Sequence, residues 1–421
     1  MTLEPYRQAL RLPGVRSLLL VATLARTPLT ATTVTVTLHV VLALDLGYGA
    51  AGLVNAALTV GNAIGAPLLG RLIDRRGLRP VLVLTMITEG LFWATAWTFP
   101  YPLLVVTALL AGMVALPVYS VARQCIAALV PADRRRPAYA LDSMAVDLSF
   151  MIGPALAVLM ATTVSPRATM LALAAGIVLS GLLFFVLNPP IRAEHEESEA
   201  VATPSLPRRQ WMTPRLIGVL AAGTATTLVL MGTDVSIVAV LRESGQVEWT
   251  GLVLAMWAAY SILGGFAYGA SSRPYSPAVL VGLLGLCTIP VGLGGAQWWL
   301  LLLALVPAGA LCAPSLAATA DAVSRLVPAR VRGEAMGLHN SSITVGLALG
   351  APLAGAVIDL LGPAWGFAAA GLFGVLLTLP VFLGELRSRG RERAGHRDSA
   401  PASQPAAPTE PLERDTAGTA V

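Results

Sequence analysis

Lysine is absent from this sequence: all 28 of its cationic residues are arginine. A P-loop requires a lysine on the nucleotide phosphates, and no GxxxxGK[ST] run or similar ATP signature occurs. A Schiff-base enzyme likewise requires a side-chain amine. We therefore expect neither ATP hydrolysis nor amine-dependent covalent catalysis from this chain.

Charged residues are also scarce. They make up 12% of the chain, against roughly 25% in a soluble domain. Hydrophobic residues make up 56%, and the mean hydropathy is +0.73. A chain of 421 residues can form ~12 membrane spans of ~20 residues with short loops. The composition therefore predicts an all-α protein that crosses the lipid bilayer many times.

Cysteine is rare, and its placement indicates neither a disulfide nor a metal site. Cys125, Cys287 and Cys312 are far apart, lie in or beside apolar segments and form no CxxC pair. We interpret them as small buried apolar side chains. No nucleophile–base pair or metal cluster is recognisable, so the sequence predicts no enzyme, no metal and no cofactor.

Twelve apolar segments follow one another along the chain. They cover residues 15–44, 50–70, 80–99, 102–124, 138–163, 167–188, 215–241, 250–271, 277–296, 298–322, 334–360 and 364–385. The first is rich in threonine, a residue typical of strands. Its length nevertheless favours a helix, because an isolated strand cannot satisfy its backbone in lipid.

The net charge of +5 reflects topology and not nucleic-acid binding, because the arginines lie in short loops between apolar segments. Of the 28, 24 fall on the side that holds both termini. Arg167 and Arg242 fall on the other side, Arg26 lies within a span, and Arg123 lies at the boundary. The positive-inside rule predicts cytoplasmic termini and an even number of spans.

The chain divides into two related halves. We expect six-helix bundles at 1–188 and 215–385, a solvated linker at 189–214 and a disordered tail at 386–421. Residues 129–157 align without gaps on residues 326–354 at an offset of 197, with 10 of 29 positions identical. A repeat in the same orientation predicts two parallel bundles that face each other, with a site between them near the bilayer midplane.

The loop after the second span reads GRLIDRRGLRP at residues 70–80. It resembles the signature G-x-L-a-D-r-x-G-r-r of the major facilitator superfamily, and the span count, linker and repeat extend the resemblance over the whole chain. In that family the loop latches the cytoplasmic side against the start of span eleven, here about residues 332–338. The gating residues that the resemblance implies are Gly70, Asp74, Arg75, Gly77 and Arg79. The equivalent loop at 265–273 lacks the acid, so a second latch is not predicted.

Span five carries a second resemblance. Residues 149–157 are similar to the antiporter signature G-x-x-x-G-P-x-x-G-G, although only Gly153 and Pro154 match outright. The resemblance implies a helix kink, close packing against the facing bundle and export in exchange for protons; the alternative is a kink without directional meaning. Span four lacks the family's R-x-x-Q-G pattern. We therefore interpret Arg123 as a surface or latch residue that can pair with Asp74; the alternative is a buried proton-relay arginine.

Four ionisable residues lie deep in apolar segments: Arg26, Glu89, Asp147 and Asp234. Charge at bilayer depth costs about 2.5–3.5 kcal/mol on insertion scales, so such groups face a protein interior, a partner or a water-filled path. They either carry protons or contact substrate, or they form static ion pairs. Arg26 is interpreted as the only buried fixed cation, and His39 as a polar residue at the outer headgroup level.

Further polar and aromatic residues lie in the spans. Asp142, whose repeat partner is His339, is interpreted as a structural residue near the membrane–water interface. Spans one, four, seven and ten line the cavity in this family. The aromatic residues that line an apolar pocket, or else simply pack, are Tyr119, Trp93, Trp257 and Tyr260.

The leading functional hypothesis is a monomeric transporter in a bacterial plasma membrane. It exports small apolar or amphipathic compounds, such as drugs or secondary metabolites, in exchange for protons. The alternative is an importer of sugars or other neutral solutes, whose cavity would need more amides than Asn55, Asn62, Gln124 and Asn340. A transport-dead sensor would need an added folded domain, and no segment is long enough for one.

Overall fold

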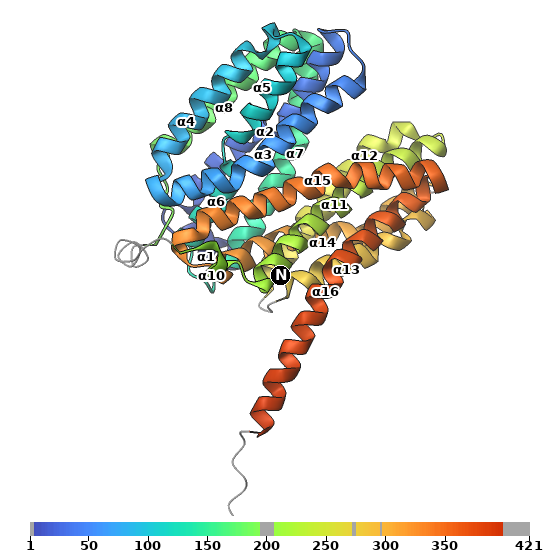
Figure 1. Ribbon diagram of the computed structural model, residues 1–421. Helices are drawn as coiled ribbons and strands as arrows, with labels where there is room; N and C mark the ends of the chain where they lie inside the picture. The colour runs from blue at the N-terminus through green and yellow to red at the C-terminus, as the bar shows by residue number, and fades with distance from the viewer. Residues whose placement is uncertain (1–3, 194–205, 272–274, 295–296, 399–421) are drawn as a thin grey trace, which may run out of the picture. The chain divides into compact units, whose positions relative to one another are not determined.

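A computed structural model of the chain describes residues 4–193, 206–271, 275–294 and 297–398, and all regular secondary structure in these ranges is helical (Figure 1). The chain forms two compact units, Met1–Val381 and Phe382–Val421. The candidate site lies entirely in the first unit.

Helices α1 to α8 form the N-terminal half. Their bounds are α1 (Glu4–Arg11), α2 (Val15–Leu42), α3 (Tyr48–Arg76), α4 (Leu78–Thr95), α5 (Tyr101–Met113), α6 (Val118–Leu129), α7 (Arg135–Thr163) and α8 (Pro166–Leu187). The short α10 (Arg208–Trp211) precedes the second half. Its helices are α11 (Pro214–Glu243), α12 (Thr250–Ala270), α13 (Pro277–Thr288), α14 (Trp298–Leu326), α15 (Arg332–Leu361) and α16 (Pro363–Asp398).

Twelve helical segments in the described ranges are long and apolar enough to cross a membrane. The expected spans are confirmed, with ends that differ by a few residues. α16 runs past the expected end of the last span, to Asp398, whereas the rest of the tail, 399–421, lies outside the described residues.

The threonine-rich first span is helical because its hydroxyls bond within the helix. The Oγ1 atoms of Thr23, Thr35 and Thr37 donate to carbonyls four residues earlier, at 2.7–2.8 Å. This bonding satisfies each hydroxyl without water, so the segment spans lipid as a helix despite its composition.

The fourth span is broken into α5 and α6 by residues 114–117. Pro117 precedes the first residue of α6 and has no N–H to continue the α5 ladder. The backbone N–H of Leu116 lies in this break, and it donates instead to Oε2 of Glu89 on α4 at 2.7 Å. A buried carboxylate therefore supports the break.

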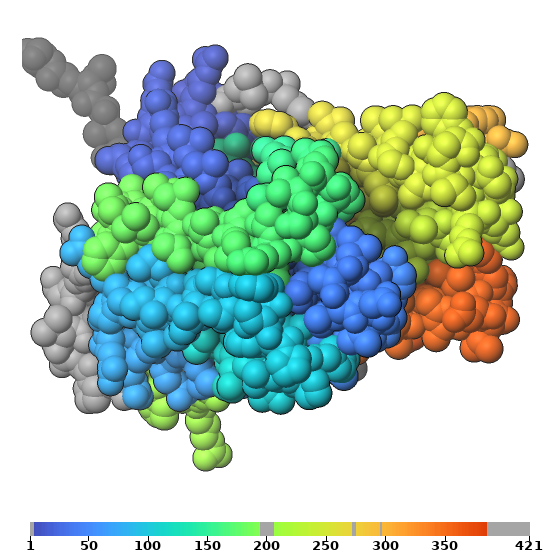
Figure 2. All heavy atoms as spheres, turned by 90° about the horizontal axis from the view of Figure 1, so that it is seen from above, coloured from blue at the N-terminus to red at the C-terminus, as the bar shows by residue number. Residues whose placement is uncertain are grey.

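Each half has its own apolar core. Trp93 and Phe92 belong to the core of the first half, and Trp257 and Phe367 belong to that of the second. Large exposed leucines on the helix exteriors, such as Leu91, are expected to face lipid. In Figure 2 the first half, blue to green, covers most of the viewed face, and the second half, yellow to orange, lies against it.

The halves meet mainly through α3 with α15, α7 with α12 and α14, and α6 with α15. Glycines permit the α3–α15 approach: a Cβ on Gly70 would lie 2.1 Å from the Gly333 carbonyl oxygen, and one on Gly337 would lie 2.3 Å from that of Ala66. We call this region, with the last turns of α3 and the first turns of α15, the closed end.

Candidate functional site

Asp74 joins the two halves at the closed end. Its Oδ1 accepts from the backbone N–H of Gly333 at 3.0 Å, and its Oδ2 accepts from that of Glu334 at 2.8 Å. These donors belong to the first turn of α15, where the helix dipole favours a carboxylate. Gln124 of α6 adds a hydrogen bond to Oδ1 at 3.2 Å. The Asp74 carboxylate thus caps a helix of the opposite half.

Glu334 holds the same contact from the other side. Arg71 approaches it bidentately, with Nε at 2.9 Å and Nη2 at 2.8 Å, and Arg208 also pairs with Oε1 at 2.5 Å. Sequence reasoning missed Glu334 and Arg208, although an acid in the first turn of span eleven is a visible signal for a latch partner. Bidentate pairing makes Arg71 a specific cross-half contact.

The other arginines implied for gating lie elsewhere. Arg75 is exposed, and Arg79 lies 5.1 Å from the ring centroid of Phe185 in its own half. Gly77 adopts φ +82° at the turn between α3 and α4, a conformation that favours glycine. The structure therefore brings Gly70 and Asp74 to the opposite half, and Gly77 shapes the loop.

A second set of contacts closes the far side of the same end. Tyr6 of α1 donates to the carbonyls of Gly265 and Phe266, at 3.0 and 2.7 Å. Burial raises the pKa of Tyr6 to about 12, so its hydroxyl stays protonated. Arg136 donates to the Ser271 carbonyl at 2.7 Å. Partners from the first half thus replace the acid that the second loop lacks.

A buried charge cluster lies behind the Asp74 contact. Arg26 Nη2 donates to Asp142 Oδ1 at 2.6 Å, and Arg123 Nε donates to Asp142 Oδ2 at 3.3 Å. Across the interface, Arg123 Nη1 contacts His339 Nδ1 at 3.2 Å. The Arg26 guanidinium also lies 5.2 Å from the ring centroid of Tyr119.

This cluster corrects two expectations. Arg123 is 3% exposed and pairs with Asp142 and His339, not with Asp74. Arg26 is therefore not the only buried cation. Proximity to the end of span four misled the interpretation of Arg123, because α6 turns its basic residue inward. Arg26 Nε and Nη1 have no hydrogen-bond partner among the described residues, so its guanidinium keeps two buried donors.

Asp147 and Asp234 lie beside a contact between the halves. Asp147 of α7 accepts from Ser261 Oγ of α12 at 2.6 Å, and Ser261 in turn accepts from the Ala313 N–H of α14 at 3.1 Å. Asp234 of α11 is close enough to Asp147 for their charges to interact, and it neighbours Trp257. Neither acid has an ion-pair partner among the described residues. Both are half-buried.

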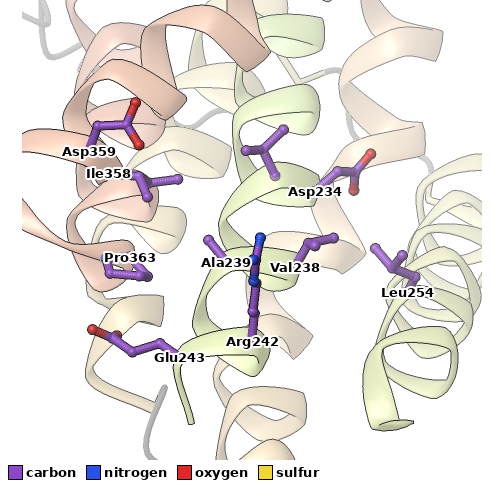
Figure 3. A pocket seen from close by; sticks show the side chains of 10 residues that line it. Asp234, Val238, Ala239, Arg242, Glu243, Leu254, Ile358, Asp359 and Pro363 are labelled. Carbon is purple, nitrogen blue, oxygen red and sulfur yellow. The ribbon is translucent and has the colours of Figure 1, made fainter. Parts of the chain in front are cut away.

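A cavity of about 750 Å³ opens beside Asp234, away from the closed end (Figure 3). Its walls come from the last turns of α11 and α15, the first turns of α12 and the first residue of α16. Figure 3 shows Asp234 and Arg242 on α11, with Asp359 and Pro363 to one side and Leu254 to the other. Six of the ten lining residues are apolar, and the other four are Asp234, Arg242, Glu243 and Asp359.

The remaining expected site residues occupy other surroundings. Trp93 is 1% exposed and packs in the apolar core of the first half, one of its two expected roles, and Tyr260 is half-buried. Gly153 packs on Thr27 and Thr30 of α2 in the same half, so its expected contact with the facing bundle is wrong. α7 continues through Pro154.

His39 lies in the last turn of α2, at the end of the first span. It is 2% exposed, and neither ring nitrogen has a hydrogen-bond partner among the described residues. Its expected depth at the headgroup level stays a prediction. In the described ranges no group of three or more His, Cys, Asp or Glu side chains is arranged to hold a metal.

Comparison with solved structures shows the same architecture in known transporters. The human organic anion transporter MFSD10 (TETRAN) is 18% identical, with a TM-score of 0.66 over 87% of this chain and 99% of that chain. A bacterial homologue of the iron transporter ferroportin, in an outward-facing state, is 14% identical, with a TM-score of 0.69 over 88% and 99%. The proton:xylose symporter XylE is 16% identical, with a TM-score of 0.64 over 87% and 94%.

At these identities the likeness shows the fold. A search of curated protein sequences finds no match. The family model of the Major Facilitator Superfamily matches residues 18–294 and 244–416, which together cover most of the chain. The twelve helices make this a multi-pass membrane protein with a secondary-transporter fold. The chain belongs to the major facilitator superfamily.

Proposed function

We propose that this protein is a proton-coupled secondary transporter that exports small apolar or amphipathic compounds by alternating access. The observation that carries the proposal is the pair of acids Asp147 and Asp234 beside a contact between the halves. Asp147 belongs to the first half, yet it bonds to Ser261 of the second. A change at this carboxylate therefore acts directly on a contact between the halves.

Protons explain why these acids are tolerated at bilayer depth. A charged carboxylate is costly there unless it is paired, and Asp147 and Asp234 have no ion-pair partner among the described residues. Binding a proton removes the charge, and releasing it restores an acceptor for Ser261 or for a cationic cargo. Arg26 cannot neutralise them, because its Nη2 is committed to Asp142 at 2.6 Å.

The cavity supports an apolar cargo. Valine, leucine, isoleucine and proline side chains line most of it, and Arg242 is its one cationic lining residue. Substrates with several negative charges would require several fixed cations. A lipophilic compound of drug size fits a volume of this order, since such sites span about 300–1,000 Å³. In the proposed cycle, protonation of Asp234 on the outer side releases cargo, and deprotonation inside resets the site.

The arginine distribution supports cytoplasmic termini in a bacterial plasma membrane, which makes the closed end the cytoplasmic end. With that orientation the Asp74 contact is the cytoplasmic gate, and the cavity faces outward. Glu89 has a supporting role in this account, because it holds the Leu116 N–H at the break in the fourth span. Trp257 lies beside Asp234 and shields it from one side.

The second candidate is an importer of sugars or other neutral solutes; XylE, whose fold is similar, is a proton:xylose symporter. Its cavity would need free amides. Asn340 instead donates to Asn62 at 3.2 Å, Asn55 donates to Thr37 at 3.0 Å, and Gln124 bonds to Asp74. These amides are engaged in contacts between helices, which favours the exporter.

Proton movement in inverted membrane vesicles tests the proposal. Energised vesicles receive a panel of lipophilic cations and antibiotics while the pH gradient is followed by a fluorescent dye. We expect a substrate-induced collapse of the gradient that is lost in Asp234→Asn and Asp147→Asn. The matched control Asp133→Asn removes an exposed carboxylate that pairs only weakly, at 3.6 Å, with Arg134, and it should behave like wild type. A folded protein that never collapses the gradient would shift the weight to the importer.

A further inference from the structure

His339 makes a buried polar contact between the halves. It lies on α15 with 0% of its surface exposed, and its Nδ1 is 3.2 Å from Nη1 of Arg123 on α6, which is 3% exposed. The two residues are separated by 216 positions in the sequence. This contact exists only while α6 and α15 are together, so it belongs to the closed state of this end.

The hydrogen-bond pattern fixes the protonation state of the imidazole. A guanidinium only donates, so Nδ1 must be the acceptor from Arg123. The other ring nitrogen, Nε2, lies 3.0 Å from Thr319 Oγ1, and that hydroxyl donates its own hydrogen to the Leu316 carbonyl at 2.9 Å. Nε2 must therefore carry a hydrogen and donate it to Thr319. The closed end requires a neutral His339 with its proton on Nε2.

We propose that His339 is a proton-accepting gate residue whose protonation releases the closed end. The inference rests on the alternating-access function proposed above and assigns one step of it. A proton from solvent adds to the Nδ1 lone pair, and the product is an imidazolium with N–H groups on both nitrogens. Arg123 loses its acceptor and faces a like charge, so α6 and α15 separate.

The surroundings of His339 make this response specific. From α6 the charged group in contact is Arg123, with Asp142 of α7 and Arg26 of α2 behind it. α14 contributes the neutral hydroxyl of Thr319, and α11 contributes Gly223, at which an added Cβ would lie 3.6 Å from the imidazole.

The carboxylates of the latch are engaged elsewhere. Asp74 of α3 bonds to the backbone of residues 333 and 334, and Glu334 pairs with Arg71 and Arg208. Among the described residues, therefore, none of the carboxylates at this end is hydrogen-bonded to His339 to stabilise an imidazolium in the closed state.

Arg123 is placed so that opening leaves no lone buried charge. Its Nε stays paired with Asp142 of its own half at 3.3 Å when His339 departs. Asp142 and His339 occupy equivalent positions of the internal repeat, 197 residues apart. The guanidinium is thus held between equivalent side chains of the two halves.

The expected size of the effect follows from linkage. If the open state exposes the imidazole to water, it titrates near its ordinary value of about 6.5, whereas in the closed state a proton can add to Nδ1 only as the contact with Arg123 breaks. The ratio of open to closed protein then rises about tenfold between pH 7.5 and pH 5.5.

Spin labels across the closed end test the inference without any substrate. Exposed Arg76 of α3 and Pro328 before α15 are changed to cysteine in a background where the three native cysteines are replaced. Distances are measured by pulsed electron resonance on protein in nanodiscs at several pH values. In the wild-type background we expect the long-distance population to grow about tenfold, relative to the short one, from pH 7.5 to 5.5.

The informative variant is His339→Gln, whose amide accepts from Arg123 and donates to Thr319 but takes no proton. We expect it to stay closed at every pH. His39→Gln is the matched control, because His39 is also a buried histidine on a membrane helix; its pH response should equal that of wild type.

A pH-independent wild type, or a pH response kept in His339→Gln, would overturn the inference. Should His339→Gln fail to fold, Thr319→Val gives a second test, since it removes the acceptor of Nε2 and should weaken the closed state at all pH values. If no compound collapses the pH gradient in vesicles but the gate still opens at low pH, the proposed exchange of cargo for protons is wrong and the role of His339 stands.

Discussion

Replacing Asp74 by asparagine should open the closed end, and the structure gives the magnitude. The carboxylate accepts two backbone N–H groups of α15, at 3.0 and 2.8 Å. Asparagine has one side-chain oxygen, so one of these donors would face an amide NH₂ group that cannot accept. A hydrogen bond to a charged group contributes about 1.5–3 kcal/mol. Loss of the negative charge at the start of α15 removes about 0.3–1 kcal/mol more.

Together these losses destabilise the closed state by about 2–4 kcal/mol, which shifts the closed-to-open ratio about 30- to 700-fold at 1.4 kcal/mol per tenfold. The label pair at positions 76 and 328 reads this ratio directly from the two distance populations. Asp133→Asn removes an exposed carboxylate and serves as the control. A shift smaller than about threefold in Asp74→Asn, with the control unchanged, would refute the assignment of Asp74 as the principal cross-half contact.

Three further predictions concern individual contacts. Gly70→Ala should block closure and abolish transport while the protein still folds, because the new Cβ would lie 2.1 Å from a carbonyl oxygen; Gly52→Ala, with nothing within 4 Å, is the matched control for transport and folding assays. Glu89→Ala should lower the melting temperature, because it removes a buried hydrogen bond that contributes about 1–3 kcal/mol. Glu89→Gln should keep most of that stability, because an oxygen acceptor for the Leu116 N–H remains. Equal melting temperatures of the two variants would contradict the capping role. Tyr6 has a pKa raised to about 12 from an ordinary 10 by burial, so its stabilising contribution is complete below pH 10 and falls as the pH rises toward 12. Tyr6→Phe should remove that part of the pH dependence of thermal unfolding, and an unchanged profile would count against it.

The membrane spans could be predicted from the sequence because lipid imposes length and hydropathy on every helix. Even the threonine-rich α2 could be predicted as a helix, because only a helix satisfies its backbone in lipid. Its hydroxyls bond to carbonyls four residues earlier. The place of the loop around Asp74 follows from a motif whose partner, the start of α15, is a helix end with free N–H groups.

The partners of the buried charges could not be predicted, because they join residues far apart in the chain. Nothing local to Arg123 indicates that its guanidinium meets His339, and its position near the end of a span suggested the surface instead. The internal repeat did align Asp142 with His339, but their shared contact with one arginine depends on how the halves fold together. The burial of Trp93 and His39 could not be predicted for a similar reason, since depth in a helix does not say which face is covered.

Reconstituted transport under an imposed pH gradient shows whether the carrier exchanges cargo for protons. Purified protein is reconstituted into liposomes that are loaded with a lipophilic cation identified in the vesicle panel. Movement of the cation is followed with and without a proton gradient, in wild type and in Asp234→Asn. The account predicts movement of the cation against its own concentration gradient, driven by counterflow of protons, abolished by a protonophore and absent in the variant. Movement that only dissipates the cation gradient, at the same rate with or without the pH gradient and in both proteins, would contradict it.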